Sequence, residues 1–398
     1  MQNSSFKLYL EINNLNYVFL VCETDEFDNF KIVYELEQPL EGIENNRISN
    51  LKQVSDIIKK NIYIIEQKLN YTFKEIVLIL ENYEFKFINL SGFKKLNGSQ
   101  ILRENITYIL NKLKSCIDEN NEKKTVLHIF NSKFNLDYNR VENLPIGLFG
   151  DFYSHELSFI LINKNDHKNL NSIFEKCNLK IKKILVKSFV EGVNISENNK
   201  DSDTFFKVTI NKNNSKIFYF ENNSLKFHQN FQFGTDIIIK DISKILSLKE
   251  DMVKNLLDQI KLSSDILEND LIEKNFFHNK NYRKIKKKLV YEIALARVEE
   301  IFDLILFKNI NFNYYKKFSN KIYLAIADKS HIQAFREIYE KTLSNSKFNN
   351  LTFANKPSSE SILNSANKLV HFGWKKEAIP ISYYKKSLIK RFFDNIFK

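Results

Sequence analysis

The chain ends in a run of apolar and basic residues whose spacing points to membrane chemistry. Wound as a helix over residues 385–398, this segment gathers its large apolar side chains into one stripe. The stripe consists of Leu388, Ile389, Phe392, Phe393, Ile396 and Phe397. The remaining arc carries Lys385, Lys386, Lys390, Arg391 and Lys398, with Asp394 as its one acid. A basic face opposite bulky apolar residues is typical of helices that lie in a membrane interface. The alternative is that the stripe packs onto the protein's own core.

The residue types that usually carry catalysis are scattered through the chain. The seven histidines include no pair at the helical spacing of metal ligands. Cys22, Cys116 and Cys177 have neither zinc spacing nor a disulfide pattern, which indicates a reducing compartment. No G-x-S-x-G or Cys-His signature occurs. We therefore predict neither a catalytic residue nor a metal site.

Composition limits the classes of partner. The 398 residues are 43% hydrophobic, which is ample for more than one buried core. The net charge of +12 accompanies a bias toward Lys, Asn and Ile that suggests an AT-rich genome, so we do not predict nucleic-acid binding from it. The basic run "RKIKKK" at 283–288 is interpreted as a solvated helix start, or alternatively as a patch for anionic lipid or an acidic partner. No stretch of 18 apolar residues and no export signal is present.

Hydrophobic periodicity divides the chain into two similar halves. Residues 8–22 predict a hairpin around an Asn pair, followed by a strand at 31–37, a helix over 51–69 and a buried strand at 75–80. Residues 205–237 repeat the three-strand pattern with Asn-rich turns. Helical patterns follow over 239 to about 308, then a strand "KIYLAIA" and a helix at 330–344. This repetition predicts mixed sheets packed against helices.

An extra unit interrupts the first half. Residues 81–165 predict an amphipathic helix near 100–118 and two strands, "TVLHIF" and "LSFILI". A helix at 168–177 follows, and Asn178 stands where a left-handed residue would end it. The strand "IKKILVK" comes next, and the polar stretch 194–203 is interpreted as a boundary.

Several colinear stretches resemble the FtsA family of bacterial cell-division proteins, within the actin-like ATPase superfamily. "KTVLHIFNSKFNLDYNRVENLPIGLFG" is similar to the stretch leading into that family's N-P-x-G-x-x-G motif. "FGTDIIIKDISKIL" keeps the family's Gly234 and Asp241, and "ALARVEEIF" keeps Arg297, Glu299 and Glu300. "SLIKRFFDNIFK" resembles the family's amphipathic tail. The resemblance covers nearly the whole chain.

The resemblance implies an α/β, actin-like (ribonuclease H-like) duplicated fold. Two lobes would hold mixed β-sheets flanked by helices, with an inserted small α+β subdomain. The expected division is a first lobe at 1–80 and 166–195, an inserted FtsA-type subdomain at 81–165, a second lobe at 204–375, a short tether at 376–384 and a membrane-targeting helix at 385–398.

In this superfamily two hairpin turns cradle phosphate. The turns need glycine so that backbone N–H groups converge on the anion, and acidic residues hold Mg²⁺. The matching positions here lack both features. In the first turn, Asn13 and Asn14 stand where glycine and Thr or Ser are expected. In the second turn, three glycines are replaced by Asn211, Lys212 and Asn213, and the two Asp residues are replaced by Thr209 and Lys216. Ile326 and Ala327 replace a glycine pair near the adenosine, while Arg297 and Glu300 are kept.

We therefore expect ATP hydrolysis to be lost or very weak, and tight nucleotide binding to be absent. The alternative is a working site for ATP and Mg²⁺ in which Lys212 and Lys216 supply charge to the phosphates. That alternative corresponds to an active actin-like ATPase whose nucleotide cycle drives polymerisation.

The resemblance implies a scaffold that anchors FtsZ filaments to the inner membrane and polymerises itself. The implied partners are FtsZ, anionic inner-membrane lipids, further copies of the chain and other division proteins. The implied location is the cytoplasmic face of the inner membrane at the division site. Because the FtsZ tail is acidic-flanked in many bacteria, residues 283–288 are a candidate receiver. An actin-fold chaperone or pilus-assembly ATPase is a further alternative, which the inserted unit and the tail disfavour.

Overall fold

The computed structural model describes residues 5–24, 30–44, 46–81, 83–199, 202–259, 265–277, 282–319, 321–326, 332–344, 350–354 and 357–378. The chain divides into two compact units, Met1–Val190 with Ala366–Lys398, and Glu191–Ser365. Two helices, α4 (Lys187–Asn198) and α10 (Ser359–His371), continue from one unit into the other.

The first unit is built on a five-stranded sheet. Its strands, in spatial order, are β11 (Lys180–Val186), β6 (Glu75–Leu80), β1 (Ser5–Ile12), β2 (Asn16–Thr24) and β3 (Phe30–Pro39). β1, β6 and β11 run parallel, while β2 and β3 are antiparallel. Two-residue strands β4 (Ile43–Glu44) and β5 (Arg47–Ile48) form a separate ribbon.

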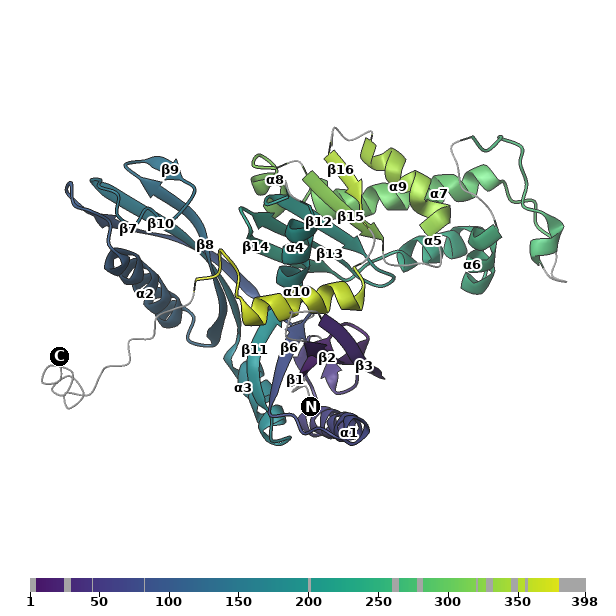
Figure 1. Ribbon diagram of the computed structural model, residues 1–398. Helices are drawn as coiled ribbons and strands as arrows, with labels where there is room; N and C mark the ends of the chain where they lie inside the picture. Colours follow the sequence, from purple (N-terminus) through teal and green to yellow (C-terminus); the bar gives the residue numbers. More distant parts are fainter. Residues whose placement is uncertain are drawn as a thin grey trace, which may run out of the picture. The chain divides into compact units, whose positions relative to one another are not determined.

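Helices α1 (Leu51–Leu69) and α3 (Lys164–Glu175) cover one face of this sheet (Figure 1). α1 forms because its apolar residues recur at three- and four-residue spacing, and its N-cap Asn50 accepts a hydrogen bond from the Gln53 amide. Alternation along β1 sends Leu8 and Leu10 into the core beneath α1. Tyr9 and Glu11 therefore lie on the opposite face.

A second sheet in this unit belongs to the inserted segment. It contains β7 (Lys86–Lys95), β10 (Phe152–Asn163), β8 (Lys124–Leu136) and β9 (Asn139–Val141), in that spatial order. Helix α2 (Arg103–Asn120) packs on it through Ile109 and Leu113. The approach is close at Gly92, where an added Cβ would lie 2.5 Å from the Ile109 side chain.

The second unit repeats the strand order of the first. Its sheet runs β14 (Ser224–Phe231), β13 (Ser215–Glu221), β12 (Phe205–Ile210), β15 (Lys321–Ile326) and β16 (Asn350–Phe353). As in the first unit, three antiparallel strands lead into two parallel ones. The accompanying helices are α5 (Asp236–Leu246), α6 (Glu250–Gln259), η1 (Lys274–Phe277), α7 (Lys287–Phe302), η2 (Asp303–Phe307), α8 (Ile310–Tyr315) and α9 (Ile332–Ser344). The duplicated topology confirms the predicted repeat.

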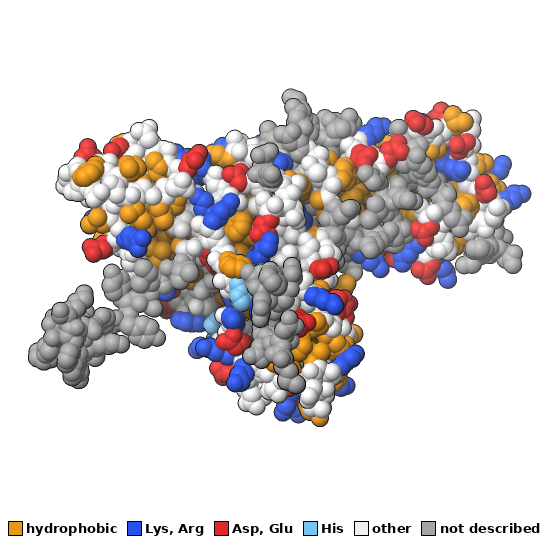
Figure 2. Space-filling model, viewed as in Figure 1, with side chains coloured by type: hydrophobic (Ala, Val, Ile, Leu, Met, Phe, Trp, Pro, Cys, Tyr) orange, Lys and Arg blue, Asp and Glu red, His pale blue; other side chains and the backbone are white. Residues whose placement is uncertain are grey.

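The predicted hairpins, the helix over 51–69 and the left-handed Asn178 (φ 57°) are confirmed. Helical segments were expected over 239 to about 308, and α5, α6, α7 and η2 lie there, while residues 282–286 are not helical. Leu271 and Lys286 form an antiparallel bridge there, because Ile272 and Ile285 turn into the core and share a backbone hydrogen bond. Lys and Arg side chains are interspersed with Asp and Glu over the face drawn in Figure 2. None of the helices in the described ranges combines the length and apolarity that a membrane crossing requires.

Candidate functional site

Three charged residues meet where the parallel strands of the first unit end. Ile12, Leu80 and Val186 are aligned across β1, β6 and β11. Glu11 precedes the first of them, while Glu81 and Lys187 directly follow the other two. The carboxyl edge of parallel strands is the usual ligand-binding edge of such sheets.

The Lys187 ammonium bridges the two carboxylates of this cluster. Its Nζ lies 2.7 Å from Glu11 Oε1 and 2.8 Å from Glu81 Oε2. The three side chains are only 8 to 11% exposed. Charges this deeply buried are tolerated when they are paired and hydrogen-bonded. The edge where a ligand would bind is therefore occupied by the chain's own ion pairs.

The first Asn turn satisfies its own backbone. Asn13 Oδ1 accepts hydrogen bonds from the Leu15 amide (2.9 Å) and the Asn16 amide (2.8 Å). The Asn13 amide donates to the Asn16 carbonyl, and Asn13 Nδ2 donates to Glu11 Oε1. Three backbone N–H groups of the turn, those of Asn13, Leu15 and Asn16, are thus already paired within it.

The second turn is also closed internally. The Asn211 amide donates to the Asn214 carbonyl, and the two side chains share a 2.6 Å hydrogen bond. The amides of Thr235 and Asp236, where α5 begins, donate to the carbonyls of Asn211 and Lys212. Gly234 is required for this approach, because an added Cβ would lie 2.0 Å from the Asn211 carbonyl oxygen.

The second unit contains a buried cluster in which one carboxylate pairs with two lysines, the reverse of the cluster in the first unit. Glu191 on α4 accepts hydrogen bonds from Lys207 Nζ (2.9 Å) and Lys216 Nζ (3.1 Å). The three side chains are 3 to 5% exposed. Lys216 therefore forms a buried ion pair with Glu191, whereas Lys212 is exposed.

The structure also describes most of the other positions that the resemblance assigned to the nucleotide site. Thr209 is buried, and its hydroxyl has no hydrogen-bond partner in the described part of the chain. Arg297 on α7 pairs with Asp241 of α5 and with Glu300. These three residues line a cavity of about 370 Å³. Ile326 ends β15, and Ala327 lies outside the described residues.

The chain is similar in sequence to several cell division proteins. No protein-family model matches the chain. It is 23% identical over 308 residues to the cell division protein FtsA of Buchnera aphidicola subsp. Schizaphis graminum (strain Sg), covering 76% of this chain and 73% of that protein. It is 20% identical over 308 residues to FtsA of Neisseria meningitidis serogroup B (strain ATCC BAA-335 / MC58), covering 77% and 74%. The chain is a divergent relative of FtsA.

The fold of this FtsA relative is actin-like. A solved PilM–PilN type IV pilus biogenesis complex superposes with a TM-score of 0.54 at 9% identity, over 92% of this chain and 98% of that one. FtsA of Escherichia coli (strain K12) is 18% identical over 234 residues, covering 59% of this chain and 55% of that protein.

The residues at the family's phosphate positions do not fit magnesium and a nucleotide. The Leu15 and Asn16 amides of the first turn are paired with the Asn13 side chain, and Lys216 is paired with Glu191. Lys187 already lies between Glu11 and Glu81. No group of three or more His, Cys, Asp or Glu side chains in the described ranges is placed to hold a metal ion.

The charged cluster residues were not predicted as site residues from the sequence. They are Glu11, Glu81, Lys187, Glu191 and Lys207. The available signal was a charged residue inside or directly after an otherwise apolar strand, as in "LYLEI", "EIVLILE" and "KILVK". Such residues share a sheet edge whenever their strands are parallel.

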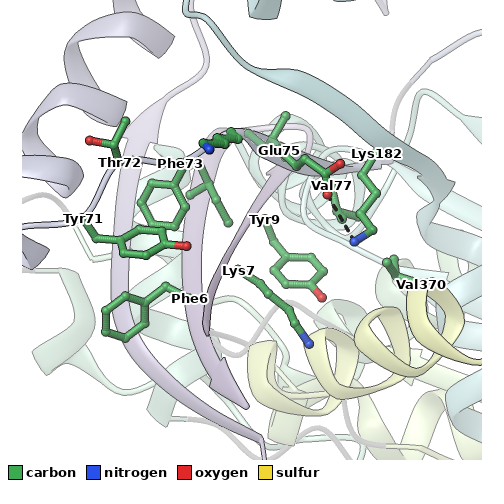
Figure 3. A pocket seen from close by; sticks show the side chains of 13 residues that line it. Phe6, Lys7, Tyr9, Tyr71, Thr72, Phe73, Glu75, Val77, Lys182 and Val370 are labelled. Atoms are coloured by element: carbon green, nitrogen blue, oxygen red, sulfur yellow. Dashed lines mark ion pairs between the residues drawn. The ribbon is translucent and has the colours of Figure 1, made fainter. Parts of the chain in front are cut away.

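Another cavity, of about 550 Å³, lies at the amino ends of β1 and β6. Figure 3 shows the rings of Phe6, Tyr71 and Phe73 grouped together, with Lys182 paired to Glu75 (3.2 Å) at a different part of the lining. Because these residues lie at the strand ends opposite the Asn13 turn, the cavity is separate from the candidate nucleotide site.

The segment after α10 is attached to the inserted sheet. The Asn131 amide donates to the Lys376 carbonyl, and the Ala378 amide donates to the Ile129 carbonyl, both at 2.7 Å. Glu377 contacts His128 Nδ1 (2.9 Å) and Lys183 Nζ (2.8 Å). Residues 376–378, at the start of the expected tether, are thus paired with β8. The membrane-binding residues expected at 385–398 lie outside the described residues.

Glu377 makes this attachment pH-dependent. Burial alone would raise the pKa of Glu377, but the hydrogen bond and charge of His128, together with Lys183, outweigh burial and lower it to about 2. Because the pKa of Glu377 is lower in the folded state than its ordinary value of 4.5, the ionised carboxylate stabilises the folded state at pH values above 4.5. This stabilisation is lost as the pH falls from 4.5 toward 2.

We expect Glu377→Gln to be less stable than the wild type by about 3 kcal/mol at pH 7, with the difference shrinking below pH 4.5. Denaturant unfolding at pH 7, 4 and 2.5 measures this difference. Glu119→Gln, at an exposed position on α2, is the control and should show no such trend. A difference that stays constant down to pH 2.5 would contradict the role of Glu377.

Proposed function

We propose that this actin-like cell-division protein is an FtsA-type scaffold that anchors FtsZ filaments to the cytoplasmic face of the inner membrane, at the division site. The observation that carries the proposal is the complete apolar stripe of residues 385–398, in a chain related to FtsA over 76% of its length. Self-association into filaments and contacts with other division proteins are part of the same proposal.

The energetics of the stripe suit reversible anchoring. Full burial of a side chain such as Leu, Ile or Phe contributes roughly 1.5 to 3 kcal/mol, and interfacial immersion about half of that. Each basic residue near anionic lipid adds about 1 kcal/mol. Ordering a short helix costs several kcal/mol in return. Single copies would therefore bind reversibly, and a filament would bind more strongly through multivalency.

The attachment of Glu377 and Ala378 to β8 supports a short reach for the anchor. Only residues 379–384 separate this attachment from the expected helix. Six extended residues span at most about 20 Å. The inserted subdomain would consequently lie close to the bilayer.

The basic run is the proposed receiver for the acidic FtsZ tail. Arg283, Lys284 and Lys286 are exposed, while Ile285 between them is buried in the core of the second unit. The backbone there is fixed, since the Ile272 and Lys287 amides donate to the carbonyls of Ile285 and Asp270. Three cations would thus be presented on an ordered segment.

Recruitment of fluorescent FtsZ to a supported anionic bilayer tests the anchoring function. We expect recruitment to require this chain and to fall at least tenfold when Arg283, Lys284 and Lys286 are all changed to Glu, since attraction of the acidic tail becomes repulsion. The matched control reverses three other exposed lysines of the same unit, Lys249, Lys316 and Lys317. Equal recruitment by both variants would exclude the run as the receiver.

We infer further that the scaffold works without ATP hydrolysis. The support comes from the pairing of Lys216 with Glu191 and from the turns, in which the amides of Asn13, Leu15, Asn16 and Asn211 are hydrogen-bonded within the chain. The carboxylates that would hold a metal at the second turn are replaced by Thr209 and Lys216. Regulation by nucleotide turnover would then be absent.

A further inference from the structure

We propose that the Lys187 ammonium is a built-in cation that takes the place of a divalent metal ion between Glu11 and Glu81. This inference rests on the proposed loss of the nucleotide cycle, and it names what occupies the sheet edge instead. It makes the carboxyl edge of the first sheet independent of metal ions.

The two carboxylates need a cation between them. Glu11 and Glu81 end neighbouring parallel strands and are each about one-tenth exposed. Like charges at this depth repel strongly, because water screens them poorly. A magnesium or manganese ion commonly binds through one or two carboxylates with water completing its coordination. The pair therefore has the chemistry of a divalent-cation site, with an ammonium group at its centre.

Lys187 is held in place by the fold. It directly follows β11 and is the first residue of α4, so its backbone is fixed by a strand on one side and a helix on the other. Its Nζ contacts both carboxylates at 2.7 and 2.8 Å. A dissolved metal ion would have to displace an ammonium that is covalently tethered to the site, which is a large entropic disadvantage.

The second unit supports the same interpretation with the signs exchanged. There Glu191, four residues further along α4, lies between Lys207 and Lys216. Lys216 occupies a position where the resemblance implies an acidic metal-binding residue. α4 therefore supplies the shared counter-ion in each unit, Lys187 for two carboxylates and Glu191 for two ammonium groups.

Manganese binding to the full chain tests the proposal. Wild type, Lys187→Arg, Lys187→Gln, Glu81→Gln and the double variant Lys187→Gln/Glu81→Gln are titrated with Mn²⁺ while the electron paramagnetic resonance signal of the free ion is recorded. Melting temperatures are measured in EDTA and in Mn²⁺. Magnesium is then used to displace any bound manganese.

We expect Lys187→Gln to bind one more equivalent of Mn²⁺ than the wild type. In EDTA its melting temperature should fall by roughly 6 to 20 °C, because two buried carboxylates lose their cation. Mn²⁺ should restore several degrees of that loss, since a ligand that binds only the folded state stabilises it. Wild type, Lys187→Arg and the double variant should gain neither the extra equivalent nor the stabilisation.

Two results obtained with soluble variants overturn the proposal. One is a stoichiometric Mn²⁺ site in the wild type that disappears in Glu81→Gln. The other is a folded Lys187→Gln variant that gains nothing from Mn²⁺. If the Lys187→Gln variant is insoluble in EDTA, it is expressed in the presence of Mn²⁺. Recovery of soluble protein under that condition supports the proposal. Failure to recover, while the neutral triple variant Lys187→Met/Glu11→Gln/Glu81→Gln folds, refutes it. Vesicle binding should be unchanged in every folded variant, so failure of membrane anchoring remains a separate outcome.

Discussion

Replacing Glu191 with glutamine is expected to lower the free energy of unfolding by about 3 to 5 kcal/mol. The carboxylate is the shared partner of Lys207 and Lys216, and all three side chains are nearly inaccessible to water. Neutralising the Glu191 carboxylate leaves the buried ammonium groups of Lys207 and Lys216 close together without the anion that they share. Equilibrium urea unfolding at pH 7, followed by circular dichroism, measures the loss.

Two controls separate the ion pairs from helix effects. Glu299→Gln changes an exposed carboxylate on α7 and should shift the unfolding free energy by less than about 0.5 kcal/mol. The apolar triple variant Glu191→Leu/Lys207→Met/Lys216→Met should recover most of the lost stability, because it removes the charges together. A loss below about 1 kcal/mol for Glu191→Gln would show that these pairs contribute little.

Calorimetry with Mg-ATP is expected to show no saturable binding. A dissociation constant of about 1 mM corresponds to only about 4 kcal/mol of binding free energy, and we expect binding to be weaker than that. The Leu15 and Asn16 amides of the first turn are already hydrogen-bonded to the Asn13 side chain. Of the two lysines that could replace them, Lys216 is buried against Glu191. We also expect no release of phosphate.

An active actin-like ATPase serves as the positive control in the same buffer. Micromolar binding together with phosphate release would overturn the inference that hydrolysis is lost and would favour a nucleotide-driven polymer. Restoring glycine at Asn13 alone should not produce binding, because Lys187 and Lys216 would still occupy the places of a metal and an acid.

Local patterns predicted the elements of this fold well. The alternation of "LYLEI" and the three- and four-residue spacing over 51–69 depend only on neighbours along the chain, so β1 and α1 were predicted with their ends correct to within a few residues. The duplicated strand order was predicted because the Asn-rich hairpins recur in both halves. Within the helical region expected over 239 to about 308, residues 282–286 are not helical, since the Ile272 amide donates to the Ile285 carbonyl.

The candidate site was predicted only in part. The resemblance placed the Asn-rich turns and the missing carboxylates at the family's phosphate positions, and that assignment stays a prediction. Sequence reasoning missed the Glu11–Glu81–Lys187 cluster, in which Lys187 contacts residues that lie 176 and 106 positions earlier in the sequence. It also missed the pairing of Glu377 with His128, 249 residues away. Such contacts are created by strand order and helix placement, which periodicity does not specify.

Vesicle co-sedimentation most directly tests the anchoring function. The full chain and a chain ending at Tyr384 are each mixed with liposomes containing anionic lipid, with and without ATP, and the pelleted fraction is measured. Anchoring by residues 385–398 predicts that the full chain pellets, that the shortened chain stays in the supernatant, and that ATP changes neither result. Equal pelleting of the two chains would contradict it.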